Sequence, residues 1–568
     1  MKNINKLMVI ATLLSASFAD MVAKDNKKAE AAPLRISVQQ RLPSGLDVGA
    51  WIVANRIERW KPTETAIIIC DMWDKHWCRD ATDRVAEMAP RMNEVLTIAR
   101  EKGVKIVHAP SGCMNFYKDY PGRKEAQKYN DPKFIKKAGL VDGKWPDKLP
   151  TEEGAVWPVD QSDEGCENPD CKPGGVWKRQ IETLTVKDED LITDSGTEAG
   201  NYFFKKGIKN VILVGVHTNM CVIGRPFGLR AMKQLGMNVM LMRDMTDLMY
   251  NRAMWPFVDH FSGLDLMVEY IETYVCPSIV STDFTGKKQF VFKGDKRPRI
   301  AFLTAESEYR ANQRLPEFAH ELTLKNIHCD FAVGIPIMAE SKKDADPKVK
   351  AEYAAYGMPI DIDVKSPKTF SPTRHNLENL QILEDADLAV FFIRRRALEP
   401  EKMAQIKAYV SSGRPVLGIR TASHAFDAKG NVPRSGGGIE VATENTSDLL
   451  AQWPEFDKDV LGGNYQGHYG HLNTGTDISL APGMENHPLL KGVAPFTSPN
   501  WLYKNRPLRT DKAQVLLLGS NPDVPDEPVF WLNGKNAVYT SLGHWDDWKI
   551  NNFRTLMFNT VDYLLNQK

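Results

Sequence analysis

Short apolar runs alternate with stretches of helical periodicity along much of the chain, and this alternation constrains the fold more than any other feature. Four such runs lie in the first half: 65–70, 104–108, 211–216 and 238–242. Helical stretches such as 84–102 and 222–235 lie between them. A parallel strand is buried on both faces and needs a crossover helix to reach the next strand. The pattern therefore predicts an α/β domain with a mostly parallel sheet.

A second series of apolar runs indicates a second domain of the same broad class. Its runs are 300–304, 388–393, 415–419, 515–518 and 537–540. A chain of 568 residues is too long for one ordinary core. We therefore expect two three-layer α/β/α domains with mostly parallel sheets, at 33–281 and 297–568, joined by a polar linker at 282–296. An insertion at 115–178, rich in Lys, Pro, Gly and Asp, is of the type that shapes a substrate entrance.

Composition excludes one class of partner, and the first residues indicate a compartment. Lys and Arg total 73 against 72 Asp and Glu, so no basic excess favours nucleic acid. Residues 1–24 read as a signal peptide, with Lys2 and Lys6 before an apolar stretch at 7–19. That stretch is well short of the ~20 residues that span a bilayer, and no later stretch is long and apolar enough. We expect a periplasmic or secreted protein without a membrane span.

All 8 cysteines follow the signal-like segment. In an oxidising compartment some of them should pair, and Cys166 and Cys171 lie in a turn-rich loop where a short disulfide would fit. If Cys221 remains a thiol, seven others are left. At least one more is then unpaired, unless it bonds to another chain.

Two reactive side chains follow strands of the first predicted sheet. Asp71 comes directly after the run 66–70, and Cys221 follows the run that ends at Val216, at the start of a helix. Catalytic groups collect at the carboxyl ends of parallel strands, and a helix amino terminus lowers the pKa of a thiol. The alternative is that Cys221 fills an apolar core and Asp71 caps a helix.

The sequence Gly-Val-His-Thr-Asn-Met-Cys-Val at 215–222 resembles the nucleophile turn of the isochorismatase-like hydrolases, which include nicotinamidases and carbamoyl-amide hydrolases. Segments 66–72, 207–214 and 243–244 extend the resemblance. It implies a cis peptide bond between Val216 and His217, Asp71 as the acceptor of the thiol proton, and Cys221 as the nucleophile. Amide N–H groups near His217 and Cys221 would stabilise the oxyanion. We expect the pocket to include His76, His108 and Asn219.

The family's third catalytic residue, a Lys, is missing. The aligned position carries Asp194. Lys178 and Lys187 are the nearest candidates to supply the cation, and Lys178 is the better one because it closes the insertion. A zinc set of His76, Cys78, His108 and Cys113 is conceivable, but the metal motif of some nicotinamidases is not present in its usual form. We predict no metal or other cofactor.

The second half resembles the ThuA-like family, named for trehalose utilisation and built on the class I glutamine-amidotransferase fold. The matching segments are 418–424, 462–468, 539–547 and 552–554. The amidotransferase nucleophile is replaced by Arg420, which cannot attack a carbonyl, so glutaminase chemistry is excluded. Either each polar residue at the strand ends is an ordinary hydrogen-bonded residue, or together they form a pocket for a hydroxyl-rich or anionic ligand. The expected pocket residues are Glu308, Arg396, Arg420, His424, His468 and His544.

Three hypotheses follow. In the first, an exported hydrolase cleaves an amide or carbamoyl C–N bond with its thiol, while the ThuA-like half binds or processes a carbohydrate-like molecule. In the second, the thiol site has lost turnover with its Lys and the chain is a binding protein. In the third, the chemistry lies in the second domain, with His424, His468 and His544 transferring protons. The partner is a small molecule in each case, and the thiol-hydrolase resemblance is compatible with a homo-oligomer.

Overall fold

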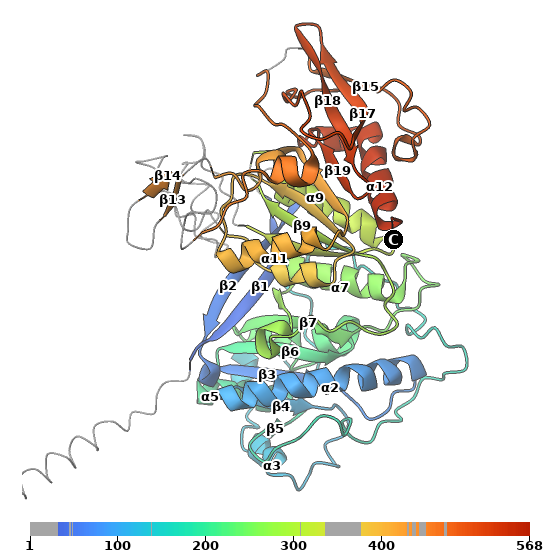
Figure 1. Cartoon of the computed structure of the whole chain (residues 1–568). Coiled ribbons are helices and arrows are strands. Elements are labelled where there is room, and N and C mark those ends of the chain that lie inside the picture. Colours follow the sequence, from blue (N-terminus) through green and yellow to red (C-terminus); the bar gives the residue numbers. More distant parts are fainter. Residues whose placement is uncertain are drawn as a thin grey trace, which may run out of the picture.

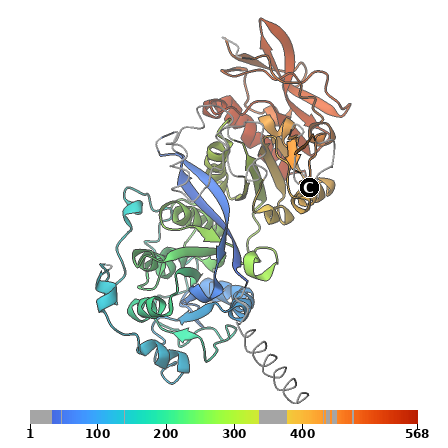
Figure 2. The ribbon, with the colours of Figure 1, turned by 90° about the vertical axis from the view of Figure 1, so that its left-hand side faces the viewer.

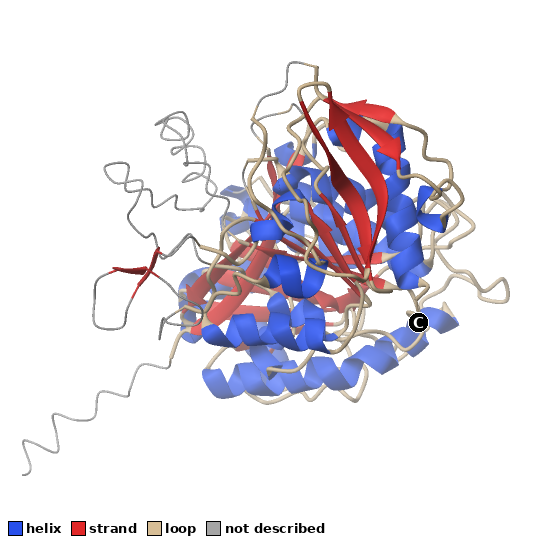
Figure 3. Cartoon of the chain, turned by 45° about the horizontal axis from the view of Figure 1, so that its top comes forward, coloured by secondary structure: helices blue, strands red, loops and turns tan. Residues whose placement is uncertain are grey.

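A computed structural model describes residues 32–567, apart from 45–46, 48, 138, 142, 307, 335–375, 429–430, 434–438, 442–449 and 471–473. Two α/β bodies lie one above the other, the first in blue to green and the second in yellow to red (Figure 1). Helices flank both sheets (Figure 3). The predicted signal peptide at 1–24 lies outside the described residues. Among the helices described, none is long and apolar enough to cross a membrane.

The first sheet has the strand order β2-β1-β8-β7-β6-β3-β4-β5. Its parallel part consists of β3 (Thr65–Cys70), β4 (Lys105–Ala109), β5 (Leu191–Ile192), β6 (Asn210–Val216), β7 (Asn238–Asp247) and β8 (Ser278–Ile279). An antiparallel hairpin of β1 (Leu34–Pro43) and β2 (Trp51–Trp60) extends the sheet beyond β8. The four predicted runs are the four central strands, so the α/β expectation is confirmed for this half.

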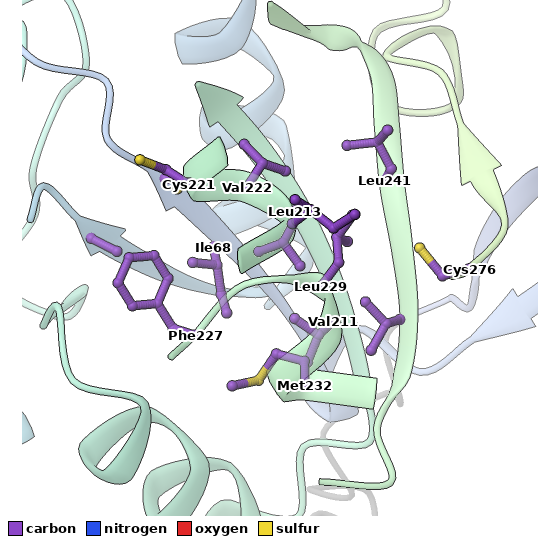
Figure 4. Close-up of a cluster of buried hydrophobic side chains, with 14 of the residues drawn as sticks. Ile68, Val211, Leu213, Cys221, Val222, Phe227, Leu229, Met232, Leu241 and Cys276 are labelled. Atoms are coloured by element: carbon purple, nitrogen blue, oxygen red, sulfur yellow. The ribbon is translucent and has the colours of Figure 1, made fainter. Parts of the chain in front are cut away.

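Helices cover both faces of this sheet. On one face α2 (Arg79–Lys102) buries Val85, Met88, Met92 and Val95, which recur at helical spacing. On the other face an apolar cluster joins Val211 and Leu213 of β6 to α5 (Gly196–Lys206), α6 (Leu229–Gln234) and α7 (His260–Tyr274). Cys221 lies at the edge of that cluster (Figure 4). Short helices α3 (Pro121–Gln127), α4 (Lys133–Lys137) and α8 (Thr282–Thr285) complete the domain.

The single helix predicted for 222–235 is wrong. A π-helical turn at Thr218–Val222 comes first, and α6 begins only at Leu229. Pro226 lies between them, and because proline has no backbone N–H it cannot continue the helical hydrogen bonds. The break places Arg225 on a short irregular segment soon after the turn that contains Cys221.

The second sheet has the order β10-β9-β11-β12-β19-β18-β17-β15-β16. Its first five strands are parallel: β10 (His328–Val333), β9 (Arg299–Ala305), β11 (Leu388–Ile393), β12 (Val416–Ile419) and β19 (Ala537–Thr540). The rest are antiparallel: β18 (Val524–Asn533), β17 (Ala513–Asn521), β15 (Thr476–Leu480) and β16 (Phe496–Ser498). The sheet is thus mixed, and the predicted run 515–518 lies in its antiparallel part.

Within the described segments of this half, three helices flank the second sheet: α9 (Ala311–Thr323), α11 (Pro400–Ser411) and α12 (Asn551–Leu565). A separate two-stranded ribbon pairs β13 (Asn431–Pro433) with β14 (Ile439–Val441). The fold class expected for both halves, α/β, is confirmed.

The N-terminal hairpin joins the two domains. It extends from the first body to the second (Figure 2), where Val53 of β2 lies in the apolar cluster of the second domain. The Asn55 side chain accepts a hydrogen bond of 2.9 Å from the backbone N–H of Val333. The expected linker 282–296 contains α8, and its Phe292 stacks on Phe261 of α7. The connection is therefore packed against the first domain.

Candidate active site

Asp71 stands at the carboxyl end of β3 with its side chain fully buried. Its φ of 47° lies in the left-handed region, where non-glycine residues are uncommon. The backbone N–H of Ser111 donates to Oδ1 at 2.7 Å, and the Asp71 N–H donates to the Ala109 carbonyl at 3.2 Å. Contacts with the end of β4 thus fix the direction of the carboxyl group.

Cys221 lies in the π-helical turn that follows β6. The Val216–His217 peptide bond is cis, as the family resemblance implied. Cys221 is 7% exposed, and its thiol lies close enough to the Asp71 carboxyl group for each group to shift the pKa of the other. The structure therefore brings the predicted nucleophile and its acidic partner into contact.

Arg225 supplies the cation at this pair. Its Nε donates to Asp71 Oδ2 at 3.0 Å, and its guanidinium group also interacts with the Cys221 thiol. Arg225 follows Cys221 by four residues, so the segment that carries the thiol also carries the cation. Arg225 was not predicted from the sequence, because the family resemblance pointed to a Lys near the preceding strand. The four-residue spacing was the signal that could have found it.

Burial and neighbouring charges set the protonation of the pair. Burial, and then the Asp71 charge, raise the pKa of the Cys221 thiol, while Arg225 opposes this. Burial also raises the pKa of Asp71, and Arg225, Cys221 and Ser111 partly offset that rise. The resting site thus holds a protonated thiol next to a carboxylate that is more basic than usual. This is the protonation state needed for transfer of the thiol proton to Asp71.

The structure does not bring Lys178 to this pair. Its side chain is exposed, and its backbone N–H donates to Asp74 Oδ1 at 3.0 Å. Asp194, at the position of the family Lys, accepts the Gly112 N–H at 3.1 Å. Lys178 was predicted as the cation beside Asp71, and this is corrected: within the part of the chain described, the cation that pairs with Asp71 is Arg225, from the segment after β6.

Aromatic side chains surround the thiol turn. Trp73 and Trp177 stack with ring centroids 4.2 Å apart, and His76 lies 4.9 Å from His217. Trp145 covers Arg225 at 5.3 Å. Trp145 and Trp177 both belong to the insertion 115–178, which therefore contributes to the site's surroundings. Burial lowers the pKa of His76 to about 4 and that of His217 to about 3, so both rings are neutral at physiological pH.

His108 and Asn219, both expected in the pocket, instead make hydrogen bonds that hold neighbouring parts of the protein together. His108 is fully buried and bridges Gln180 and Asp190 with its two ring nitrogens, at 3.0 Å each. The Asn219 amide nitrogen donates to Gln161 at 2.6 Å and to the Met249 carbonyl at 2.7 Å, and its oxygen accepts the Met249 N–H. Both side chains are fully committed to protein partners. The conceivable zinc set fails for the same reason, since both ring nitrogens of His108 are occupied.

The second domain contains a cavity of about 770 Å³ at the carboxyl ends of its parallel strands. Glu308, His424 and His468, predicted from the sequence, line it. Tyr309, Tyr465 and Tyr503 also line the cavity, although they were not predicted from the sequence. Tyr465 belongs to the ThuA-like segment 462–468, and that segment was the signal that could have indicated it. The other lining residues include Arg394, Arg395, Asp427, Asp457 and Arg509.

Arg396 and Arg420 do not line this cavity. Arg396 is buried and its Nε donates to the Ala305 carbonyl at 3.1 Å. Arg420 is 1% exposed, and its guanidinium carbon lies 4.1 Å from the Tyr309 ring and 4.7 Å from the Tyr503 ring. Arg420 therefore packs against two tyrosines of the cavity wall without lining the cavity itself. His544, another predicted pocket residue, does not line the cavity either: its ring centroid lies 5.3 Å from that of Tyr309, and burial lowers its pKa to about 3.

No protein-family model matches the chain, and no curated protein matches it. Solved structures similar to it include a cysteine hydrolase from Pseudomonas syringae pv. phaseolicola, with 14% identity over 39% of this chain and 91% of that one, at a TM-score of 0.23. An isochorismatase family protein from Burkholderia thailandensis has 11% identity over 39% and 93%, with a TM-score of 0.22. A ThuA-like protein from Parabacteroides merdae has 12% identity over 48% and 91%, with a TM-score of 0.29. The similar structures thus include both families that the sequence resembles.

Proposed function

We propose that the first domain is a cysteine hydrolase that cleaves an amide or carbamoyl-type C–N bond of a small molecule. The observation that carries this proposal is the contact of Asp71 with both the Cys221 thiol and Arg225. A nucleophile, a base and a cation thus meet at the carboxyl ends of β3 and β6. Export of the chain is part of the proposal, on the strength of the signal-like sequence at 1–24.

The reaction proceeds in two halves. Asp71 accepts the proton of Cys221 as the sulfur forms a bond to the carbonyl carbon, and the carbonyl oxygen becomes an oxyanion. Backbone N–H groups near His217 and Cys221 stabilise that oxyanion. Asp71 then returns the proton to the leaving nitrogen, the C–N bond breaks and a thioester remains. Water, deprotonated by Asp71, cleaves the thioester and restores the thiol.

Arg225 keeps Asp71 ionised in a buried position. A carboxylate without a partner in this environment would take up a proton and lose its function as a base. The guanidinium group also faces the sulfur, so it stabilises the thiolate that forms when the proton moves. In the isochorismatase-like hydrolases that the sequence resembles, the third catalytic residue, a Lys, would supply this positive charge.

Trapping the thioester tests the proposal. The full chain is mixed with a panel of small primary amides and carbamoyl compounds, quenched in acid during turnover and analysed by peptide mass mapping. We expect an acyl adduct on the peptide that contains Cys221, and none on the peptide with Cys276, a buried cysteine of the same apolar cluster (Figure 4). Release of ammonia or amine without any adduct on Cys221 would refute the mechanism.

The second domain supports a second candidate function, the binding of a carbohydrate-like molecule. Tyr465, which is partly exposed, lines the cavity together with Tyr309 and Tyr503, while Glu308 and His468 offer groups that hydrogen-bond to hydroxyls. Asp457 also lines it, and burial raises the pKa of Asp457 to about 7. That carboxyl group can therefore donate or accept a proton near neutral pH.

Titration calorimetry with mono- and disaccharides tests this second function. We expect one saccharide to bind, and the change Tyr465→Ala to weaken binding by about tenfold or more, because stacking and packing of an aromatic ring are lost. His487→Ala is the matched control, since His487 precedes a short helical turn at Pro488–Leu490, away from the cavity-lining residues. If no saccharide binds, or both variants bind equally well, the cavity has another ligand.

A further inference from the structure

Three cysteines from distant parts of the chain meet beside the thiol site. Their sulfur atoms, in Cys78, Cys166 and Cys171, all lie within 4.8 Å of one another. Cys78 immediately precedes α2 and is buried, while Cys166 and Cys171 come from the insertion and are partly buried. The short Cys166–Cys171 disulfide expected from the sequence does not account for this group, because it omits the third thiol. All three are free thiols in this structure.

The local backbone gathers and supports these sulfurs. The Cys171 N–H donates to the Asn168 carbonyl at 3.2 Å, which closes a turn and returns the chain toward Cys166. The backbone N–H of Arg79, the first residue of α2, donates to Cys171 Sγ at 3.4 Å. An N–H donor at the amino terminus of a 24-residue helix favours the thiolate form, which is the metal-binding form.

We propose that Cys78, Cys166 and Cys171 form a three-thiolate site for one thiophilic d¹⁰ ion, zinc(II) or copper(I). Thiolate ligands select these ions, and zinc accepts three protein ligands with a fourth position left to water. A disulfide would use two of the three sulfurs, whereas an ion uses all of them. Binding releases the thiol protons to solvent and involves no electron transfer.

The geometry requires a small adjustment of the insertion. Cys78 Sγ and Cys166 Sγ are 2.6 Å apart. Around zinc, with Zn–S bonds of about 2.3 Å at tetrahedral angles, two sulfurs lie roughly 3.8 Å apart. Cys166 belongs to a loop with partial exposure, so a shift of about 1 Å there is sufficient.

The ion would fix the insertion next to the nucleophile turn. Cys78 and Cys166 pack in one small apolar cluster with Met249 and with Met220, the residue before Cys221. The same insertion contributes Gln161, which holds Asn219 of the nucleophile turn. A metal at the three thiols therefore stabilises the loop that frames the thiol site, without itself contacting Cys221.

Metal analysis of the full chain tests this inference. Protein is reduced with a phosphine, incubated with zinc(II) or, in a separate arm, copper(I), desalted and measured by plasma mass spectrometry. We expect about one bound ion per chain in at least one arm. Cys171→Ser should lose at least about tenfold in affinity, whereas Cys329→Ser, which changes a partly buried cysteine outside the cluster, should bind as the unchanged chain does.

A disulfide is the competing outcome, and the Cys171 variant distinguishes it. If Cys78 and Cys166 form a bond that resists reduction, peptide mapping will find it in both the unchanged chain and Cys171→Ser, and neither will hold a stoichiometric ion. That result, or an ion retained equally by Cys171→Ser, would overturn the metal site. Because the readout is metal content, it is independent of hydrolase activity.

Discussion

Cys221→Ala is expected to lower the turnover of an amide substrate by at least about 10⁴-fold, because it removes the atom that forms the thioester. Substrate binding should change much less, since the aromatic residues around the turn and Arg225 remain. The fold should also persist, because Cys221 lies at the edge of its apolar cluster and alanine leaves only a small void. Steady-state kinetics with circular dichroism as a check of folding measure both effects.

Cys276→Ala provides the matched control for this substitution. Cys276 is 2% exposed and belongs to the same apolar cluster, but it lies on the opposite side of that cluster from Cys221 (Figure 4). We expect this variant to keep full turnover despite a similar loss of packing. If Cys221→Ala kept its C–N hydrolysis, the nucleophile would have to be elsewhere. If it lost that activity but still converted a saccharide, the second domain would be an independent enzyme.

The sequence predicted the centre of each sheet well and its edges poorly. Strands such as β3 and β11 are buried along their whole length, so they appear as continuous apolar runs. In the hairpin strands β1 and β2, polar and charged residues interrupt the apolar ones, so these strands gave no such run. Arg41 of β1, for instance, lies 3.6 Å from Glu272 of α7. A partner more than 200 residues away cannot be inferred from local pattern, so nothing in the sequence around Arg41 indicated this contact.

The candidate site, too, could be predicted only in part from the sequence. Asp71 and Cys221 could be predicted because each follows a strand whose position in the sheet is fixed by its apolar run. The environment of the pair could not, because it depends on where a long insertion returns. Trp145 reaches Arg225 from that insertion, and a Cβ on Gly224 would lie 2.5 Å from the Trp145 ring. Glycine at this position permits the close approach, and no spacing rule predicts it.

Arg225→Gln is expected to lower kcat by about 10²- to 10³-fold, the usual cost of removing one charged group that stabilises the reacting centre. The physical reason is the loss of the only ion pair of Asp71 within the described residues. Arg225→Lys retains the charge and should keep a larger share of activity, although Lys lacks the planar fork of Arg. Lys178→Gln is the control and should leave kcat unchanged, since the Lys178 side chain is exposed.

The pH profile of kcat/KM distinguishes a role of Arg225 in keeping Asp71 ionised from a merely structural role. Asp71 acts as a base only when ionised, so activity falls as the pH drops through its pKa. Arg225 favours the ionised form and lowers that pKa, against the rise caused by burial. Removing the guanidinium group must therefore move the acidic limb of Arg225→Gln toward higher pH, while Arg225→Lys moves it less. An unchanged limb in Arg225→Gln, or a comparable loss in Lys178→Gln, would show that another cation controls Asp71.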